Sequence, residues 1–468
     1  MLITIARAEN AVLQEKVKQL TERVKFLTVE NETLKAEVEL YRNEAAVSCL
    51  SRLSMNAEDA VDSSNNAMQT DHVLPHDYFV KSGNGIYPNQ NEVTLSHWFG
   101  SANPLCCTLS NDDTLVAAGA ANGYVNVVPW GALDAKQPDR MSDDNEDDDA
   151  VAKQLDALVQ SQSLNMSLNA PVICTSFSPY LSRSHGTRAH VMAAGCMDGS
   201  FQVMKLHHSS FQGLQLASTT ISKNVTNEYK HRKYIRTVAW SPTHPLLATA
   251  SADGNVQIFQ VKEESDQGKD VYKDSEEETP SHLSLTRVQS LHFPGAVESL
   301  TFLNDHQLVC YARGTPYLSV FDMSNDFAQS RIHLNSPNGK TVDDHVSFAV
   351  MDLNVWQNKF LVAATDAARN MVIDTASGQQ VRNLYGHAND GYSQPKAVWS
   401  QTGQYILGNT QDDGALCIWD IASSRMVERL STAHASPIRN LFSSPLTDML
   451  VTTSFDKQTK LWFVPQQC

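Results

Sequence analysis

The sequence predicts an all-β chain of repeated units preceded by an α-helical coiled coil. Residues 386–464 contain two similar units, about 45 residues apart, each with short strand-forming runs separated by hydrophilic turns. Residues 1–45 instead carry apolar side chains at heptad spacing. The chain has 468 residues, 41% of them hydrophobic, so it can form the core that a long repeat array needs.

The N-terminal residues 1–45 predict a parallel, two-stranded coiled coil. Valine prevails at the a positions and leucine at the d positions, a combination that favours parallel dimers. The predicted dimer seam consists of Leu13, Val17, Leu20, Val24, Leu27, Asn31, Leu34, Val38 and Tyr41. Asn31, at an a position, would select register and dimeric state at some cost in stability. The alternative is a single amphipathic helix lying on the rest of the chain, but the regular heptads favour the dimer.

Residues 46–91 predict a flexible linker, because they are rich in Ser, Asn and Asp and lack periodicity. The stretch 92–99 alternates in polarity and predicts a strand. The last C-terminal unit ends at Val464 without a fourth strand of its own. We therefore expect the strand at 92–99 to pair with this last unit and join the two ends of the array.

The two C-terminal units share a small residue followed by His before the first strand, and a Trp at the end of the third strand. These residues are Gly386-His387 and Trp419-Asp420 in one unit, and Ala433-His434 and Trp462 in the other. With this repeat period, the chain resembles the WD-repeat family of β-propellers. The resemblance implies an all-β fold, a seven-bladed WD40-type propeller over residues 92–464, with five fainter units before the clear pair.

The resemblance also implies buried polar groups in the better-preserved units. In the family, the loop His, a Ser of the second strand, the turn Asp and the third-strand Trp form one hydrogen-bonded chain. The matching residues are His434, Ser454, Asp456 and Trp462 in the last unit, and His231, Ser251 and Asp253 in the third, where Phe259 replaces Trp. A catalytic Ser–His–Asp set would need an exposed nucleophile. We favour the structural interpretation, since an unpaired buried polar group costs about 1–3 kcal/mol.

Two acidic insertions are expected in the array, at residues 134–169 and 262–282. Both predict loops that project between strands. Such loops can bind basic partners, but a solvated loop is the simpler interpretation.

Composition excludes several functions as primary ones. The formal net charge of −16 argues against a nucleic-acid backbone or an anionic membrane as the main partner. No apolar run approaches the ~18–20 residues of a membrane span. The eight cysteines form no Cys-x-x-Cys pair, which favours a reducing compartment, cytosol or nucleus, and argues against a zinc site. No phosphate loop, His-Glu-x-x-His or Gly-x-Ser-x-Gly motif occurs, so we expect no catalytic residues, metal or cofactor.

Partner-binding residues can be suggested only from their place before the first strand of a unit. They are Arg232, Lys233, Tyr234, Tyr392 and Ser436. The basic run at 230–236 either binds an anion or acidic peptide, or is a solvated loop.

The favoured function is a non-enzymatic scaffold or adaptor in the cytosol or nucleus. Its propeller would bind other proteins and its coiled coil would form a homodimer, which adds avidity. The layout is similar to that of autophagy conjugation adaptors, transcriptional co-repressors and, as the weakest match because their helix has no long linker, G-protein β-like subunits. One alternative is a nuclear histone or phosphopeptide reader, or a co-repressor-type subunit; a reader would need a carboxylate or basic cluster at the centre of one face. Another is a propeller hydrolase, which would need clustered acidic or His residues along the channel.

Overall fold

The computed structural model describes residues 83–96, 98–130, 161–179, 182–184, 187–209, 213–219, 229–265, 281–335, 346–389 and 394–464. The chain divides into two units, 1–72 and 73–468, and all described residues lie in the second. The predicted coiled coil with its dimer seam, most of the predicted linker and Tyr392 lie outside the described residues.

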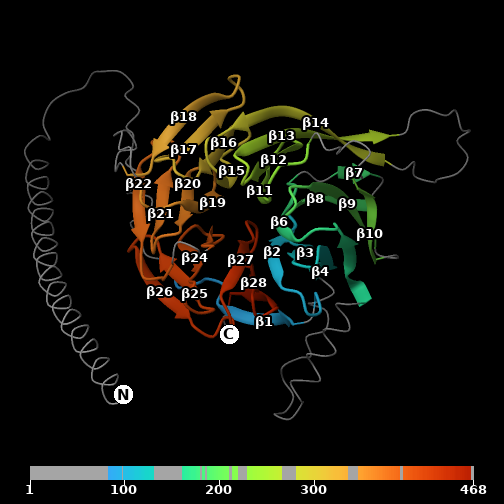
Figure 1. Cartoon of the computed structure of the whole chain (residues 1–468). Coiled ribbons are helices and arrows are strands. Elements are labelled where there is room, and N and C mark those ends of the chain that lie inside the picture. The colour runs from blue at the N-terminus through green and yellow to red at the C-terminus, as the bar shows by residue number, and fades with distance from the viewer. Residues whose placement is uncertain are drawn as a thin grey trace, which may run out of the picture. The chain divides into compact units, whose positions relative to one another are not determined.

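The described chain forms a ring of seven antiparallel sheets around a central axis (Figure 1). Each innermost strand contacts the innermost strands of both neighbouring sheets, and the last of them, β27, contacts the first, β2. The predicted seven-bladed β-propeller is therefore confirmed. We number the blades 1 to 7 by their innermost strands, in chain order.

Every blade contributes strands at four radial positions. The innermost strands are β2 (Pro104–Leu109), β6 (Val172–Phe177), β11 (Ile235–Trp240), β15 (Val297–Phe302), β19 (Val350–Trp356), β23 (Ala397–Trp399) and β27 (Ile438–Ser443). The second strands are β3 (Leu115–Ala120), β8 (Thr187–Cys196), β12 (Leu246–Ser251), β16 (Gln307–Ala312), β20 (Phe360–Thr365), β24 (Tyr405–Asn409) and β28 (Leu450–Ser454). The third strands are β4 (Tyr124–Pro129), β9 (Phe201–Ser209), β13 (Asn255–Ser265), β17 (Tyr317–Asp322), β21 (Asn370–Asp374), β25 (Leu416–Asp420) and β29 (Thr459–Phe463). The outer strands are β5 (Leu164–Ser167), β10 (Gly213–Thr219), β14 (Ser281–His292), β18 (Ala328–His333), β22 (Gln380–Leu384), β26 (Arg425–Leu430) and β1 (Gln90–Leu95), and a short strand β7 (Ser182–Ser184) pairs with β8.

The core is divided among the seven blade interfaces, each with its own cluster of buried apolar residues. Side chains alternate across a strand, so one strand serves two interfaces. In β3, Val116 and Ala118 pack toward blade 7, whereas Leu115 and Ala117 pack toward blade 2. All six residues of β3 are buried, which explains why this strand reads as an unbroken apolar run rather than an alternating one.

The ring closes through β1, which pairs antiparallel with β29 of blade 7. The expected closing strand is thus confirmed, although it spans residues 90–95 rather than 92–99. The chain before β1 also packs on the ring: the Gly83 N–H donates to Asp420 Oδ1 at 2.8 Å, and the Gly85 N–H to the Tyr405 hydroxyl at 2.6 Å. A Cβ atom on Gly83 would lie 2.2 Å from the Tyr405 ring, so only glycine permits this approach.

Two of the predicted insertion boundaries need correction. Strand β5 lies within the insertion predicted at 134–169, because the outer strand of blade 1 follows after a long interval. The hairpin of β13 and β14 likewise extends into the insertion predicted at 262–282. In both blades the interval separates a third strand from an outer strand, whereas residues 131–160 and 266–280 themselves lie outside the described residues.

Candidate functional site

Blade 7 contains a buried chain of polar side chains. The Trp462 Nε1 donates to Thr452 Oγ1 at 2.8 Å, His434 Nε2 lies 2.8 Å from the same hydroxyl oxygen, and His434 Nδ1 lies 2.8 Å from Asp456 Oδ2. Thr452, not the expected Ser454, stands between His and Trp. The Ser454 hydroxyl instead donates to the carbonyl oxygens of Ser436 and Pro437 and accepts from the Asp456 N–H at 3.2 Å.

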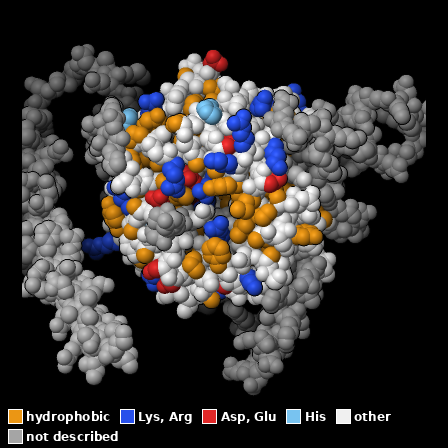
Figure 2. All heavy atoms as spheres, viewed as in Figure 1, with side chains coloured by type: hydrophobic (Ala, Val, Ile, Leu, Met, Phe, Trp, Pro, Cys, Tyr) orange, Lys and Arg blue, Asp and Glu red, His pale blue; other side chains and the backbone are white. Residues whose placement is uncertain are grey.

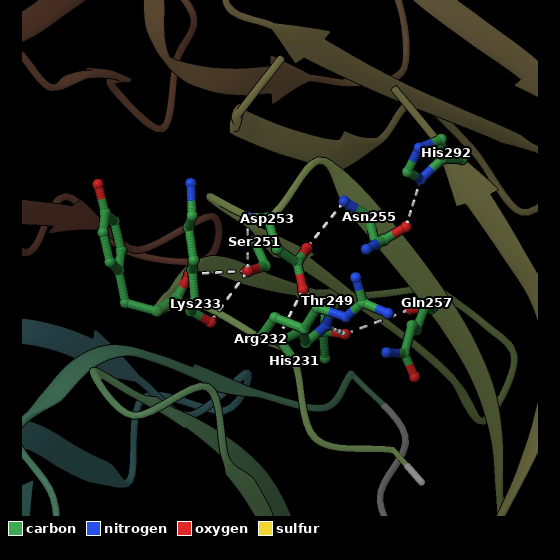
Figure 3. Close-up of polar contacts among 10 residues, drawn as sticks. His231, Arg232, Lys233, Thr249, Ser251, Asp253, Asn255, Gln257 and His292 are labelled. Carbon is green, nitrogen blue, oxygen red and sulfur yellow. Dashed lines mark hydrogen bonds and ion pairs between the residues drawn. The ribbon is translucent and has the colours of Figure 1, made fainter. Parts of the chain in front are cut away.

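Blade 3 repeats this arrangement without the tryptophan (Figure 3). His231 Nε2 lies 2.9 Å from Thr249 Oγ1, and His231 Nδ1 lies 3.3 Å from Asp253 Oδ2. Phe259 takes the tryptophan position and donates no hydrogen bond. Ser251 again bonds the loop carbonyls rather than the histidine, so the serine predicted for the chain is replaced by Thr249 here too.

The hydroxyl, histidine and carboxylate of blade 7 resemble a catalytic triad in connectivity only. Every donor is used if Trp462 donates to Thr452, Thr452 to His434 Nε2, and His434 Nδ1 to Asp456. Thr452 is fully buried, so no substrate can approach its oxygen. Burial lowers the pKa of His434 despite the neighbouring Asp456, which keeps the imidazole neutral as this assignment requires.

Blade 6 lacks the chain although it carries the Gly-His and Trp-Asp marks. In blade 7, Trp462 pairs with Leu450 of the second strand, and Thr452 follows two residues later. In blade 6, Trp419 pairs with Ile406, and the residue two positions later is Gly408. With no hydroxyl at that point, the Trp419 Nε1 donates to the Tyr385 carbonyl oxygen at 2.8 Å. Both ring nitrogens of buried His387 have no hydrogen-bond partner, and burial lowers the pKa of His387 to about 4.

The central channel holds a cavity of about 540 Å³ to which all seven innermost strands contribute. In six of these strands the ladder register shifts after the first residue, as at a β-bulge, and the extra residue lines the cavity. A bulge re-aims a side chain, so the same device puts one residue of each blade at the channel. These residues are Leu105, Ile173, Arg236, Glu298, Met351 and Arg439, and Lys396, just before β23, completes the set, which we call the mouth ring.

A buried carboxylate ties three blades together at the mouth ring. Glu298 in blade 4 lies 2.7 Å from the Nε of Arg236 in blade 3 and 2.7 Å from the Nε of Arg313. The same Arg313 reaches Asp366 of blade 5 at 3.5 Å. The Glu298 side chain is 2% exposed, so removing its partners would leave a buried charge uncompensated.

The remaining two cations of the mouth ring differ in their partners. Lys396 Nζ lies 2.7 Å from Asp352 Oδ1. No described carboxylate pairs with Arg439; its guanidinium lies over the Phe455 ring, with Cζ 5.1 Å from the centroid. Burial, and then repulsion by Arg236, lower the pKa of Arg439. The cavity therefore carries more cationic than anionic charge, from Arg236, Lys396 and Arg439 against Glu298 and Asp352.

Of the candidate binding residues that the structure describes, only Tyr234 lines the cavity. The Arg236 guanidinium lies 5.0 Å from the centre of the Tyr234 ring. Arg232 and Lys233 are exposed on the loop before β11, and Figure 3 shows Lys233 pointing away from His231 and Asp253. Ser436 is half-buried, and its carbonyl oxygen accepts from Ser454. Sequence reasoning missed Arg439, Lys396 and Glu298, whose common signal is their place at, or just before, the start of an innermost strand.

Other kinds of site have little support in the described part of the chain. No group of His, Cys, Asp or Glu there could hold a metal ion. No helix among these residues is long and apolar enough to cross a membrane. The six described cysteines are free and buried, and burial raises the pKa of the Cys106 thiol to about 11, which disfavours the reactive thiolate.

Comparison with known families agrees with this geometry. The family model described as "WD domain, G-beta repeat" matches residues 223–260 and 427–462. These two segments contain, in whole or in part, the three inner strands of blades 3 and 7, the blades that contain the threonine–histidine–aspartate chain. No curated protein matches the chain. The chain thus carries WD40 repeats within a seven-bladed propeller, a fold that serves typically as a protein-interaction module.

Proposed function

We propose that this WD40-repeat propeller is a non-enzymatic scaffold that docks protein partners at its channel mouth. The observation that carries the proposal is the mouth ring, which places side chains of mixed character from all seven blades around one cavity. The mouth ring lies on the face that carries the loops leading into the innermost strands. Figure 2 shows Lys, Arg and hydrophobic side chains gathered around the centre of one face of the molecule.

The mixed character of the mouth favours a protein partner over a small polar ligand. Leu105, Ile173 and Met351 supply apolar surface, and Met197 beside them is 57% exposed. Protein interfaces combine an apolar centre with a polar rim, and charged pairs at the rim orient the partner. A propeller hydrolase would need clustered acidic or histidine side chains in the channel, and the described lining contains no histidine.

The proposal includes dimerisation through residues 1–45 and a location in the cytosol or nucleus. The support for the dimer is the heptad pattern, and that for the location is the set of free, buried cysteines, which fits a reducing compartment. Two propellers on one coiled coil would bind a multivalent partner with avidity.

A matched pair of surface variants of the full chain tests the docking site. Met197→Asp places a charge at the mouth, whereas Leu446→Asp places one in the loop between β27 and β28, on the opposite face. The two side chains are 57% and 56% exposed, so both should leave the fold intact. Partners captured from cells and identified by cross-linking and mass spectrometry should be lost with Met197→Asp alone. Equal partner sets for both variants and the unchanged chain would contradict docking at the mouth.

Among the reader functions, a phosphopeptide reader fits the mouth better than a histone-tail reader. Histone tails are basic and would require an unpaired carboxylate in the cavity. Both carboxylates of the described lining, Glu298 and Asp352, already have cationic partners at 2.7 Å, whereas Arg439 has no carboxylate partner. Binding of phosphorylated but not of unphosphorylated peptides, with loss in Arg439→Gln, would favour this second candidate over a general scaffold.

A further inference from the structure

The mouth ring has an apolar arc flanked by two arginines. Going round the ring from blade 7 to blade 3, the residues are Arg439, Leu105, Ile173 and Arg236. Met197, in the turn between β8 and β9 of blade 2, lines the cavity beside this arc. The other side of the ring is formed by Glu298, Met351 and Lys396, whose charged groups are already engaged in ion pairs.

Of the two arginines that flank this arc, Arg236 has a carboxylate partner in Glu298 and Arg439 has none among the described residues. Arg439 is half-buried, and it faces the repulsion of Arg236. The Phe455 ring below it supplies a cation–π contact but accepts no hydrogen bond from the guanidinium plane. A planar guanidinium presents a fork of N–H donors that matches a carboxylate or a phosphate. An incoming anion would therefore relieve a charge that the described residues leave uncompensated.

We propose that the arc between Arg439 and Arg236 binds an acidic peptide segment of a protein partner. A carboxylate or phosphate of the segment pairs with Arg439, and an adjacent apolar side chain packs on Leu105, Ile173 and Met197. This proposal rests on the proposed docking function and adds the chemical class of the docked segment.

Two other anionic occupants fit less well. A nucleic-acid strand would meet Glu298 and Asp352 inside the same cavity, on a chain of net charge −16. The chain's own acidic insertions connect third strands to outer strands, between β4 and β5 and between β13 and β14. In an antiparallel blade the connections from third to outer strands lie on the face opposite the mouth. Both insertions therefore leave and re-enter the propeller on the face away from the cavity.

An array of random short peptides, including phosphoserine-containing ones, tests the proposal with the fluorescently labelled full chain. Bound peptides should be enriched in Asp, Glu or phosphoserine next to Leu, Ile, Met or Phe. Arg439→Gln should lose the acidic enrichment and weaken binding about tenfold or more, because hydrogen bonds to charged groups are among the stronger ones. Arg439→Lys should retain part of the enrichment. Arg425→Gln, an exposed arginine at the start of β26, is the matched control and should bind like the unchanged chain.

Each outcome decides between the two proposals. Peptide binding without acidic enrichment, or enrichment that survives in Arg439→Gln, overturns the acidic-peptide proposal and leaves docking at the mouth intact. Binding of inorganic phosphate to the chain, with no binding of any peptide, shows a small-anion site only and also overturns it. If no peptide binds and Met197→Asp keeps every cellular partner, docking at the mouth fails as well.

Discussion

Replacing Thr452 by valine tests whether the polar chain of blade 7 holds the blade together. Valine has nearly the shape of threonine, so the substitution opens no cavity at this fully buried position. It removes the hydroxyl that accepts from Trp462 Nε1 and contacts His434 Nε2. Both groups would then be buried without a partner. Each costs about 1–3 kcal/mol, so Thr452→Val should lower the free energy of unfolding by about 2–6 kcal/mol.

The chain offers two internal comparisons for this loss. The adjacent Thr453 is equally buried, but its hydroxyl has no hydrogen-bond partner apart from a weak contact with the Cys107 thiol. Thr453→Val should therefore change stability by less than about 1 kcal/mol, or raise it. Thr249→Val in blade 3 leaves His231 Nε2 unpaired and removes a long 3.5 Å contact with the Gln257 carbonyl oxygen, but Phe259 has no N–H to lose a partner. Its cost should be about 1–3 kcal/mol, smaller than that of Thr452→Val.

Urea unfolding of the full chain near neutral pH, followed by circular dichroism and tryptophan fluorescence, measures all three variants. The expected order of destabilisation is Thr452→Val, then Thr249→Val, then Thr453→Val. If Thr452→Val and Thr453→Val cost the same, strand packing rather than the polar chain explains the loss. If Thr249→Val costs as much as Thr452→Val, the Trp462 N–H contributes nothing and the reasoning fails.

Three further predictions concern the ion pairs, the histidines and the N-terminal segment. Glu298→Ala should cost about 1–3 kcal/mol, because it leaves Arg236, whose side chain is 18% exposed, without its carboxylate. Asp352→Ala should cost about 1 kcal/mol or less, because its pair with Lys396 is more exposed to water. Equal losses on urea unfolding would contradict this. Burial lowers the pKa of His387 from 6.5 to about 4, so the folded chain binds fewer protons than the unfolded chain between these pH values. The contribution of neutral His387 to stability is therefore present above pH 6.5 and is lost as the pH falls toward 4, by about 3 kcal/mol in total. His387→Phe should flatten the dependence of unfolding free energy on pH in that window, and an unchanged slope would refute the assignment. Leu20→Glu with Leu27→Glu should halve the mass measured by light scattering and leave the propeller's thermal transition unchanged; loss of that transition would show that residues 1–45 and the propeller are not independent modules.

The blade count could be predicted because short apolar, strand-forming runs survive where the repeat marks do not. Blades 4 and 5 have Cys310 and Ala363 at the position of Thr452, yet both positions are buried, as strands with two covered faces require. The boundary of the first insertion was harder to place. Strand β5 is separated from β4 by an acidic interval, and its four residues carry too little pattern to identify it alone.

The binding face was predicted less well than the fold because a bulge, not a motif, aims its side chains. The sequence analysis chose exposed loop residues such as Arg232 and Lys233, which precede β11. The structure brings the mouth ring together from residues within the strands, where simple alternation would assign side chains to the blade interfaces. The register shift after the first residue turns Arg236 and Arg439 toward the channel instead.

The blade that closes the ring is also the one with the complete polar chain. Blade 7 joins β1 to β27, β28 and β29 from the far end of the sequence, so its pairing is the most non-local in the fold. His434 and Asp456 fix the loop before β27 to the turn before β29, and Lys460 Nζ donates to the Ala433 carbonyl oxygen at 2.7 Å. On the opposite face, the hydroxyls of Ser444 and Thr447 both donate to Asp113 Oδ2 of blade 1 at 2.7 Å.

These contacts hold β29 in one register, and β1 can bury Val93 and Leu95 only if that register is kept, because a one-residue slip would turn both side chains to the other face. The four strands of blade 6 follow one another in the chain, so their register does not have to be held for a strand from the far end of the sequence. This is consistent with Gly408 in place of a threonine and with the unpaired His387. The polar chain therefore matters most for ring closure, and a loss of stability in Thr452→Val should be accompanied by faster hydrogen exchange of the β1 amides.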